Sequence, residues 1–406
     1  MKYIDGGVCA AKGFKASGLH CGIRKNKTKR DIALILSEKV GTAAAVYTTN
    51  LVKGAPILVD QMNLANGKAQ AVICNSGNAN TCNADGVEKA TKMCELTAKA
   101  CGILPTDVIV SSTGVIGMPL DIAPIENCMG DLYAQLDDTL EAGKNAAEAI
   151  MTTDTVLKEV AVEFEIDGTV CKMGGIAKGS GMIHPNLATM LIFITCDADI
   201  SSEMLQKALS ADVKTTFNMI SIDGDTSTND TVAIIANGMA GNKPIVSEGE
   251  AYDAFCKALY MLTSKLCKMI AADGEGATKL LECIVTGGKD VKTAQTVAKS
   301  VICSSLLKAA MFGADANWGR VLCAIGYSGA YVDINKIDVA FKSVKGELPV
   351  CKNGAGIPFS EEKVKEILLE KEIDILIDLN DGEAEATAWG CDLTYDYVKI
   401  NGDYRT

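Results

Sequence analysis

The chain is poor in the residue patterns that many common enzyme and metal sites require. Only two His residues, His20 and His184, occur among 406 residues, and none of the 16 Cys residues forms a C-x-x-C pair. A zinc site built from Cys and His therefore has no framework. A Ser-His-Asp or Cys-His enzyme would have to use one of the two imidazoles, and His184 is better interpreted as a loop residue before Pro185.

Basic patches and long apolar runs are also missing. The net charge is −12, and no cluster of Lys and Arg has the size that nucleic-acid binding needs. The densest basic stretch, residues 24–30, is expected to be a solvated loop. The longest apolar runs are too short to cross a bilayer, and the N-terminal residues lack the apolar core of a secretory signal. We therefore expect neither a nucleic-acid partner nor a membrane partner.

The cysteines are scattered, and several lie in apolar surroundings where a free thiol behaves as a small hydrophobic side chain. Examples are Cys74, Cys196, Cys303 and Cys323. Together with the missing export signal, this usage predicts the reducing cytoplasm.

The residues that are abundant predict a globular protein of mixed secondary structure. The hydrophobic fraction is 48%, the charged fraction is 22%, and the length exceeds one average domain. Strands are expected at residues 32–36, 71–74, 108–110 and 373–379, with a hairpin turning on Asp-Gly over 163–170. Helices are expected after a capping box at 85–88, over 202–218, from 294 to near 313, and from Ser360 onward. The fold class is therefore α/β in the broad sense, a mixed α+β protein.

A Thr at the head of a dense apolar run is the most informative feature. Thr189 follows Ala188 and opens the run 190–194, which predicts a central strand covered on both faces. If the bond before Thr189 breaks, this residue carries a free α-amine beside its hydroxyl, so it supplies both nucleophile and base. An α-amine with a pKa of about 7.7–8.0 suits that role near neutral pH. Taken alone, the pattern favours a Thr that only begins a strand.

Four further segments combine glycine with polar groups. Residues 112–117 place a hydroxyl before a glycine N–H, as in an oxyanion hole, although a simple turn is favoured in isolation. Residues 223–230 have part of the spacing of a calcium loop but lack its sixth-position Gly and twelfth-position Glu, so a polar loop bonded to its own backbone is favoured. Residues 273–278 hold a carboxylate that suits a substrate ammonium, with simple exposure favoured. Residues 401–406 are expected to fray.

Taken together and in order, these segments resemble one protein family. Residues 178–191 closely resemble the self-cleavage motif of the ornithine acetyltransferases, also called ArgJ proteins or glutamate N-acetyltransferases. The resemblance continues in residues 48–50, 75–80, 112–117, 151–154, 223–230, 273–276 and 404–406. It covers essentially the whole chain. It departs from the family pattern at Gly402, where Ala is expected.

The resemblance implies a fold and a set of residue roles. The implied fold is a DmpA/ArgJ-like layered αββα-type sandwich with a smaller C-terminal α/β part. Cleavage between Ala188 and Thr189 would give an α chain, 1–188, and a β chain, 189–406, with Thr189 as nucleophile. Thr113 and Gly114 are implied as the oxyanion hole. The implied substrate-binding residues are Thr152, Lys178, Thr189, Glu275, Asn401 and Thr406, with Thr153 as the alternative to Thr152.

The resemblance also implies a function in arginine biosynthesis. The implied enzyme is a cytoplasmic acyltransferase of α2β2 composition that moves acetyl from N2-acetylornithine to glutamate through Thr189, without a metal or a cofactor. Three alternatives stay open. A bifunctional enzyme would also accept acetyl-CoA as a co-substrate, and a related self-processing aminopeptidase would hydrolyse peptides. A metal-binding or scaffold protein built around residues 223–230 would not be an enzyme.

Overall fold

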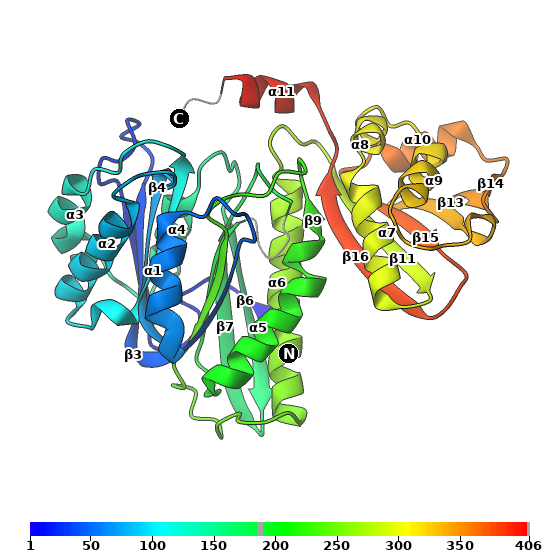
Figure 1. Cartoon of the computed structure of the whole chain (residues 1–406). Helices are drawn as coiled ribbons and strands as arrows, with labels where there is room; N and C mark the ends of the chain where they lie inside the picture. The colour runs from blue at the N-terminus through cyan, green and yellow to red at the C-terminus, as the bar shows by residue number, and fades with distance from the viewer. Residues whose placement is uncertain (185–189, 404–406) are drawn as a thin grey trace.

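The computed structural model describes residues 1–184 and 190–403, which form two sheets with helices packed against them (Figure 1). The larger sheet has nine strands in the order β1-β6-β7-β8-β10-β3-β4-β5, with β2 paired to β3. Its strands are β1 (Lys2–Ile4), β2 (Phe14–Leu19), β3 (Ile32–Tyr47), β4 (Lys68–Asn78), β5 (Val108–Val115), β6 (Lys158–Ile166), β7 (Thr169–Lys178), β8 (Leu191–Cys196) and β10 (Thr231–Ala236). The strands and the Asp-Gly hairpin expected in this part of the chain are confirmed.

The strand expected after Thr189 lies at the centre of this sheet. It begins at Leu191, and every residue of β8 and of its parallel neighbour β10 is buried. Antiparallel β7 pairs with the other edge of β8, with Lys178 opposite Leu191. The expectation of a central strand covered on both faces is therefore confirmed for its described residues.

The larger sheet curls around an inner apolar cluster. Ile35 and Val72 on β3 and β4 share this cluster with Ile176 and Phe193 on β7 and β8, and with helix α4 (Leu140–Ile150). The outer faces are covered by α1 (Ala55–Asn63), α2 (Gly86–Cys101) and α3 (Ala123–Ala134) on one arm, and by α5 (Ser202–Thr215) and α6 (Glu250–Ala272) on the other. Strands β3 and β4 on one side and strands β7 and β8 on the other contribute to one inner core, so the layered sandwich is confirmed.

A smaller C-terminal unit holds the second sheet, which confirms the expected α/β part. Its seven strands run in the order β14-β13-β12-β15-β11-β16-β9. They are β9 (Ile220–Ser221), β11 (Leu280–Gly288), β12 (Asp338–Ser343), β13 (Gly346–Lys352), β14 (Ala355–Gly356), β15 (Glu372–Asp378) and β16 (Ala384–Cys391). The helices that accompany them are α7 (Val291–Cys303), α8 (Ser305–Phe312), α9 (Trp318–Gly326), α10 (Glu361–Leu368) and α11 (Tyr395–Gly402).

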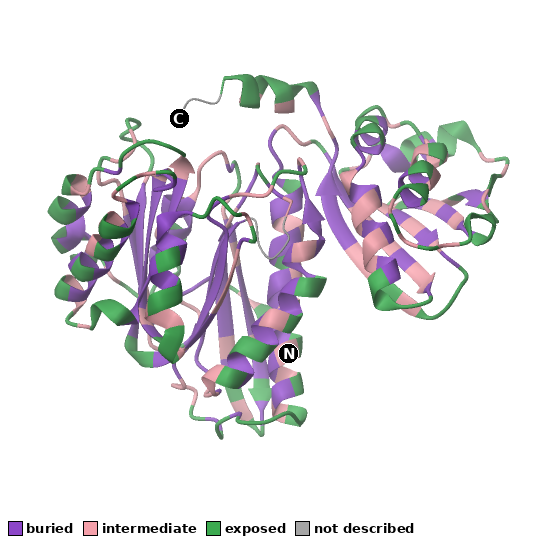
Figure 2. Ribbon diagram, in the orientation of Figure 1, coloured by how far each residue is buried: buried purple, intermediate pink, exposed green. Residues whose placement is uncertain are grey.

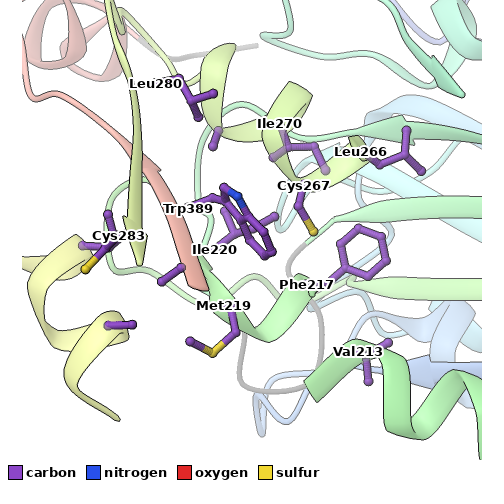
Figure 3. Close-up of a cluster of buried hydrophobic side chains, with 14 of the residues drawn as sticks. Val213, Phe217, Met219, Ile220, Leu266, Cys267, Ile270, Leu280, Cys283 and Trp389 are labelled. Carbon is purple, nitrogen blue, oxygen red and sulfur yellow. The ribbon is translucent and has the colours of Figure 1, made fainter. Parts of the chain in front are cut away.

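A continuous apolar cluster joins the two units (Figure 3). Trp389 of β16 is 2% exposed. Its ring is surrounded by Phe217 and Ile220, and by Cys267 and Ile270 of α6. Helix α6 packs against β6 and β7 of the larger sheet and also against β11 and β16 of the smaller one. The smaller sheet is therefore held against the sandwich by apolar packing.

Two helix boundaries differ from the sequence expectation. The helix expected over 202–218 ends at Thr215, because Thr216 leaves helical geometry at φ −118° and ψ −95°. The helix expected from 294 to near 313 is two helices, α7 and α8, separated at Ser304. This residue is extended, with φ −69° and ψ 107°, and its hydroxyl accepts a hydrogen bond from the Leu307 N–H. Ser304 interrupts the helical backbone and caps the next helix, but the apolar periodicity continues across it, so the pattern indicated one helix.

Two expectations about individual side chains are wrong. Helix α2 begins where expected, but the Asp85 side chain does not cap it, because its backbone is not extended (φ −102°, ψ 12°).

All sixteen cysteines are free, and Cys74 and Cys196 are buried as expected. However, Cys303 is half-buried and Cys323 is exposed. Both lie on surface helices, where local apolar neighbours in sequence need not be neighbours in space.

Other expectations about surface segments hold. Residues 24–30 form a loop with exposed Lys25, Lys27 and Lys29, which confirms a solvated stretch. Helix α10 begins after Ser360, whose hydroxyl accepts from the Lys363 N–H at 3.2 Å. Within the described residues, no helix combines the length and apolar character needed to cross a bilayer.

Candidate active site

A cavity of about 260 Å³ gathers most of the residues singled out in the sequence. It lies where β5 and β7 end and where β8 and β10 begin. The predicted site residues that line it are Thr113, Gly114, Thr152, Thr153, Lys178, Glu275 and Asn401. Met190, Leu191 and residues 227–230 complete this part of the lining. Their assembly in one cavity supports a common site, while the role of each residue remains a prediction.

The two predicted oxyanion residues form the end of a strand. Thr113 is 8% exposed, and Gly114 has φ +131°. A Cβ at Gly114 would lie 2.3 Å from the carbonyl carbon of Gly77 on the neighbouring strand β4. Glycine is therefore required here by both backbone conformation and space. The simple turn favoured in isolation is wrong, because residues 113–115 pair with β4.

A buried amide that the sequence did not single out holds this end of the site together. The Asn229 Oδ1 atom accepts from Thr81 Oγ1 and Thr228 Oγ1, both at 2.6 Å. Its Nδ2 atom donates to the carbonyls of Ala79 at 2.5 Å and Ser112 at 2.9 Å. The entry to β10 is therefore fixed against the strand that carries the oxyanion pair. The available sequence signal was the density of amide and hydroxyl groups in residues 223–230.

The polar loop that resembled a calcium site binds backbone instead. The Asp223 carboxylate accepts from the N–H groups of Met182 at 2.6 Å and Ile183 at 2.8 Å. It also accepts from the Asp225 N–H at 3.3 Å, as expected of a loop bonded to itself. Across residues 1–184 and 190–403, no group of three or more His, Cys, Asp or Glu side chains could hold a metal ion. Asp223 thus orders the segment that leads toward the predicted cleavage position.

Glu275 and Asn401 meet because of the order of the smaller sheet. β11 and β16 are antiparallel neighbours with Leu280 opposite Cys391, so the segment entering β11 emerges beside the segment leaving β16. Asn401 Nδ2 donates to Glu275 Oε2 at 2.8 Å. Glu275 is 8% exposed, so the expectation of an exposed carboxylate is wrong. A Cβ at Gly181 would lie 2.3 Å from Glu275 Cδ, so a larger residue at this position would displace the Glu275 carboxylate.

The C-terminal tail is ordered as far as the structure describes it. Asn401 lies in α11, which follows the segment leaving β16 and lies over the top of the larger unit (Figure 1). Fraying is therefore wrong for Asn401, because the hydrogen bond to Glu275 ties it to the cavity. A Cβ at Gly402 would meet no described atom within 4 Å, so the Ala expected there would fit. Thr406 lies outside the described residues.

The buried charges in and near the cavity are strongly perturbed. Burial raises the pKa of Asp230 well above its usual range, against the opposing effect of Lys178. Within the described residues, the Asp230 Oδ2 atom has no hydrogen-bond partner. Burial and the Lys299 ammonium lower the pKa of His184 to about 4. His184 does not line the cavity and contacts Ser221 Oγ at 3.1 Å, which agrees with its interpretation as a loop residue.

Two predictions depend on residues outside the described ranges. Ala188 and Thr189, the predicted cleavage pair, lie there, although Met190 lines the cavity. The boundary between the predicted α chain, 1–188, and β chain, 189–406, falls between paired strands β7 and β8. The two predicted products would therefore share one sheet. Whether Thr152 or Thr153 contacts substrate also stays open, since both line the cavity.

Comparison with known proteins identifies the family of this chain. The sequence model of the ArgJ family matches residues 15–406. The chain belongs to the ArgJ family. This match confirms the family resemblance found in the sequence.

Curated ArgJ relatives match the chain along its length. The arginine biosynthesis bifunctional protein ArgJ of Caldanaerobacter subterraneus subsp. tengcongensis is 51% identical over 408 aligned positions, which cover 100% of both chains. The arginine biosynthesis bifunctional protein ArgJ 1 of Clostridium acetobutylicum is 50% identical over 395 positions, covering 97% of this chain and 96% of that protein. A crystal structure of the arginine biosynthesis bifunctional protein argJ from Bacillus halodurans is 46% identical, with a TM-score of 0.50. That match covers 52% of this chain and 98% of the solved chain.

Proposed function

We propose that this ArgJ-family chain is a self-cleaving acetyltransferase of arginine biosynthesis. Its reaction moves the acetyl group of N2-acetylornithine to glutamate through an ester on Thr189. The observation that carries this proposal is the cavity in which Thr113, Gly114, Lys178 and Glu275 surround the start of β8. This strand begins two residues after Thr189 in the sequence. The names of the relatives, which place them in arginine biosynthesis, support the same pathway.

Maturation supplies the catalytic base. The Thr189 hydroxyl attacks the Ala188 carbonyl carbon, and the C–N bond breaks as the ester forms, which frees the α-amine. Water then hydrolyses the ester, which leaves a carboxylate on Ala188 and restores the Thr189 hydroxyl. The Bacillus halodurans structure supports this step, because 98% of that solved chain corresponds to only 52% of this one. A product of cleavage at this position would likewise span about half of the precursor.

Turnover then proceeds by two acyl transfers. The α-amine of Thr189 accepts the hydroxyl proton while the oxygen attacks the acetyl carbonyl carbon of N2-acetylornithine. The oxyanion is stabilised by donors at Thr113 and Gly114, and one such donor is worth about 10²–10³-fold in rate. The C–N bond breaks, ornithine leaves with the proton on its amine, and the amine of glutamate takes the acetyl group from Thr189.

The charges around the cavity suit amino-acid substrates. Lys178 provides an ammonium for a substrate carboxylate, and Glu275 provides a carboxylate for the side-chain ammonium of ornithine. Asn401 orients Glu275 through the 2.8 Å hydrogen bond. Glutamate has no side-chain ammonium, so only the ornithine substrate uses Glu275 in this way.

A second donor is supported by the word bifunctional in the names of the relatives. In this version of the proposal, acetyl-CoA also acylates Thr189, and the same ester acetylates glutamate. The α2β2 assembly and the cytoplasmic location belong to the same proposal, because they come from the family resemblance. A self-processing aminopeptidase is the competing use of the same nucleophile.

The decisive experiment compares Thr189→Ala with Thr169→Ala, a control at the start of β7. Thr189→Ala should leave one uncleaved and inactive chain on a denaturing gel, whereas the control should give two fragments. Acetyl transfer to glutamate is then measured with N2-acetylornithine and with acetyl-CoA as donors, beside release of free amino acids from peptides. Two fragments from Thr189→Ala would remove Thr189 from the mechanism, and peptide hydrolysis without acetyl transfer would favour the aminopeptidase.

A further inference from the structure

A buried ionic cluster that the proposed chemistry does not use lies behind the cavity. The Lys158 ammonium contacts Asp154 Oδ1 at 2.8 Å and Asp273 Oδ2 at 2.5 Å. Lys158 is 1% exposed, and both carboxylates are buried. Lys158 Nζ also donates to the Val156 carbonyl at 3.2 Å. Two carboxylates therefore share one ammonium in a region without access to solvent.

Each carboxylate also ties down backbone from another part of the chain. Asp154 accepts from the Gly179 N–H at 2.8 Å and from the Thr152 N–H at 3.0 Å. Asp273 accepts from the N–H groups of Thr155 at 3.1 Å and Val156 at 3.2 Å, and from the Thr155 hydroxyl. Three segments that are far apart in sequence are thus connected through charged side chains.

The connected segments are the ones that carry the substrate-binding candidates. Thr152 precedes Asp154 by two residues, and Lys178 directly precedes Gly179. Glu275 follows Asp273 by two residues. Two more hydrogen bonds join two of these segments. Ser180 Oγ donates to the Asp273 carbonyl at 2.7 Å, and the Glu275 N–H donates to the Ser180 carbonyl at 2.9 Å.

We propose that Lys158, Asp154 and Asp273 are positioning residues that lock the three substrate-binding segments of the cavity into one geometry. The inference rests on the proposed acetyl transfer. None of the three side chains lines the cavity, so they act through Thr152, Lys178 and Glu275. An ionic lock suits this role because its bonds are directional and are made only in one arrangement.

The charge state of the lock is set by its own contacts. Burial raises the pKa of Asp154, but the ammonium groups of Lys158 and Lys178 outweigh it and lower this pKa to about 2. Asp154 is therefore ionised across the physiological range. Replacing one partner leaves a buried charge without its counter-ion, which is far more disruptive than losing a surface pair.

Asp273→Asn is the first test variant, because it keeps size and shape but removes the charge next to the Glu275 segment. Glu275 is proposed to meet the ornithine ammonium, which glutamate lacks. We expect the KM for N2-acetylornithine to rise by about tenfold and that for glutamate by less than about threefold, since a misplacement of about 1 Å can cost up to about 10²-fold. Thr155→Val, at an exposed residue, should shift the KM ratio in the same direction by about threefold.

Glu282→Gln is the matched control. It removes an ion pair of similar length, Lys268–Glu282 at 2.7 Å, on β11 and away from the cavity. Both KM values should stay unchanged in this variant. All kinetics are expressed per cleaved enzyme, counted by intact mass, and folding is followed by the thermal unfolding midpoint.

The possible results separate the two proposals. Equal changes in both KM values, or a loss of folded enzyme with both KM values unaltered, would reduce the cluster to a structural role. If Asp273→Asn does not fold, Thr155→Val decides, and an unchanged KM ratio there overturns the inference. If the wild-type enzyme transfers no acetyl group, the proposed function fails instead, irrespective of the variants.

Discussion

The two sheets support the cavity in different ways. In the larger sheet, β8 and β10 are buried at every position, whereas β15 of the smaller sheet alternates between buried and partly exposed residues (Figure 2). Strands of the larger sheet end at the cavity. Among the described residues, the smaller sheet contributes to the cavity only through the segments that enter β11 and leave β16, which carry Glu275 and Asn401. The larger sheet therefore supplies strand ends that line the cavity, and the smaller sheet brings two distant segments together beside them.

The Lys158 cluster and an ion pair of the smaller sheet differ in the same way in how far they are buried. The Lys158 cluster in the larger unit has side chains that are 0–5% exposed. Lys342 and Asp374, which pair across β12 and β15 at 3.8 Å, are 47% and 27% exposed. The Lys158 cluster therefore fixes geometry near the cavity, whereas the Lys342–Asp374 pair is largely open to solvent, where such a pair contributes little.

The largest expected difference between the sheets concerns two glycines with similar backbone conformations. Gly114 at the cavity has φ +131°, and Gly346 at the start of β13 has φ +124°. Gly114→Ala forces Cβ to within 2.3 Å of Gly77 and should lower kcat/KM by at least about 100-fold through loss of oxyanion donors. Gly346→Ala meets no atom within 4 Å and should cost only about 1–2 kcal/mol of stability with unchanged activity. Equal activity loss in both variants would contradict the comparison.

A smaller difference is expected for the two classes of ion pair. Lys158→Met should lower the free energy of unfolding by about 3–5 kcal/mol, because it leaves two buried carboxylates unpaired. Lys342→Met should lower it by less than about 1 kcal/mol. Urea titrations are best made in the Thr189→Ala background, where one intact chain is expected. Similar losses for both variants would show that burial does not distinguish the pairs.

The smallest expected effect is the pH dependence at the junction of the two units. The pKa of His184 is lowered to about 4, so between pH 4 and pH 6.5 the unfolded chain binds the additional proton and stability rises with pH. Because His184 is partly exposed, we expect it to change the free energy of unfolding by only roughly 1 kcal/mol across this pH range. Asp212, whose pKa is raised to about 7 by burial, acts in the opposite direction, so the wild type is compared with His184→Gln. An unchanged slope from pH 5 to pH 7 would exclude the effect.

Local patterns predicted the elements well. The dense run after Thr189 identified a central strand, and the alternation at 373–379 identified a strand with one buried face. Ser304 was missed, because it ends one helix and caps the next while the apolar periodicity continues across it. The burial of Glu275 was missed as well. A Gly-rich turn gives no local sign that a helix from the end of the chain will cover it.

The sequence alone determined the family, the mixed α+β fold class and the candidates Thr113, Gly114, Thr152, Lys178 and Glu275, because each depends on local residue types and their order. The tertiary structure decided that these residues share one cavity, that Asn401 reaches Glu275, and that Asn229 and the Lys158 cluster hold the segments in place. The contacts Asn401–Glu275, Asn229–Ser112 and Lys158–Asp273 each join residues more than 100 positions apart. Their formation depends on strand order and on the packing of the two sheets, which no short stretch of sequence encodes.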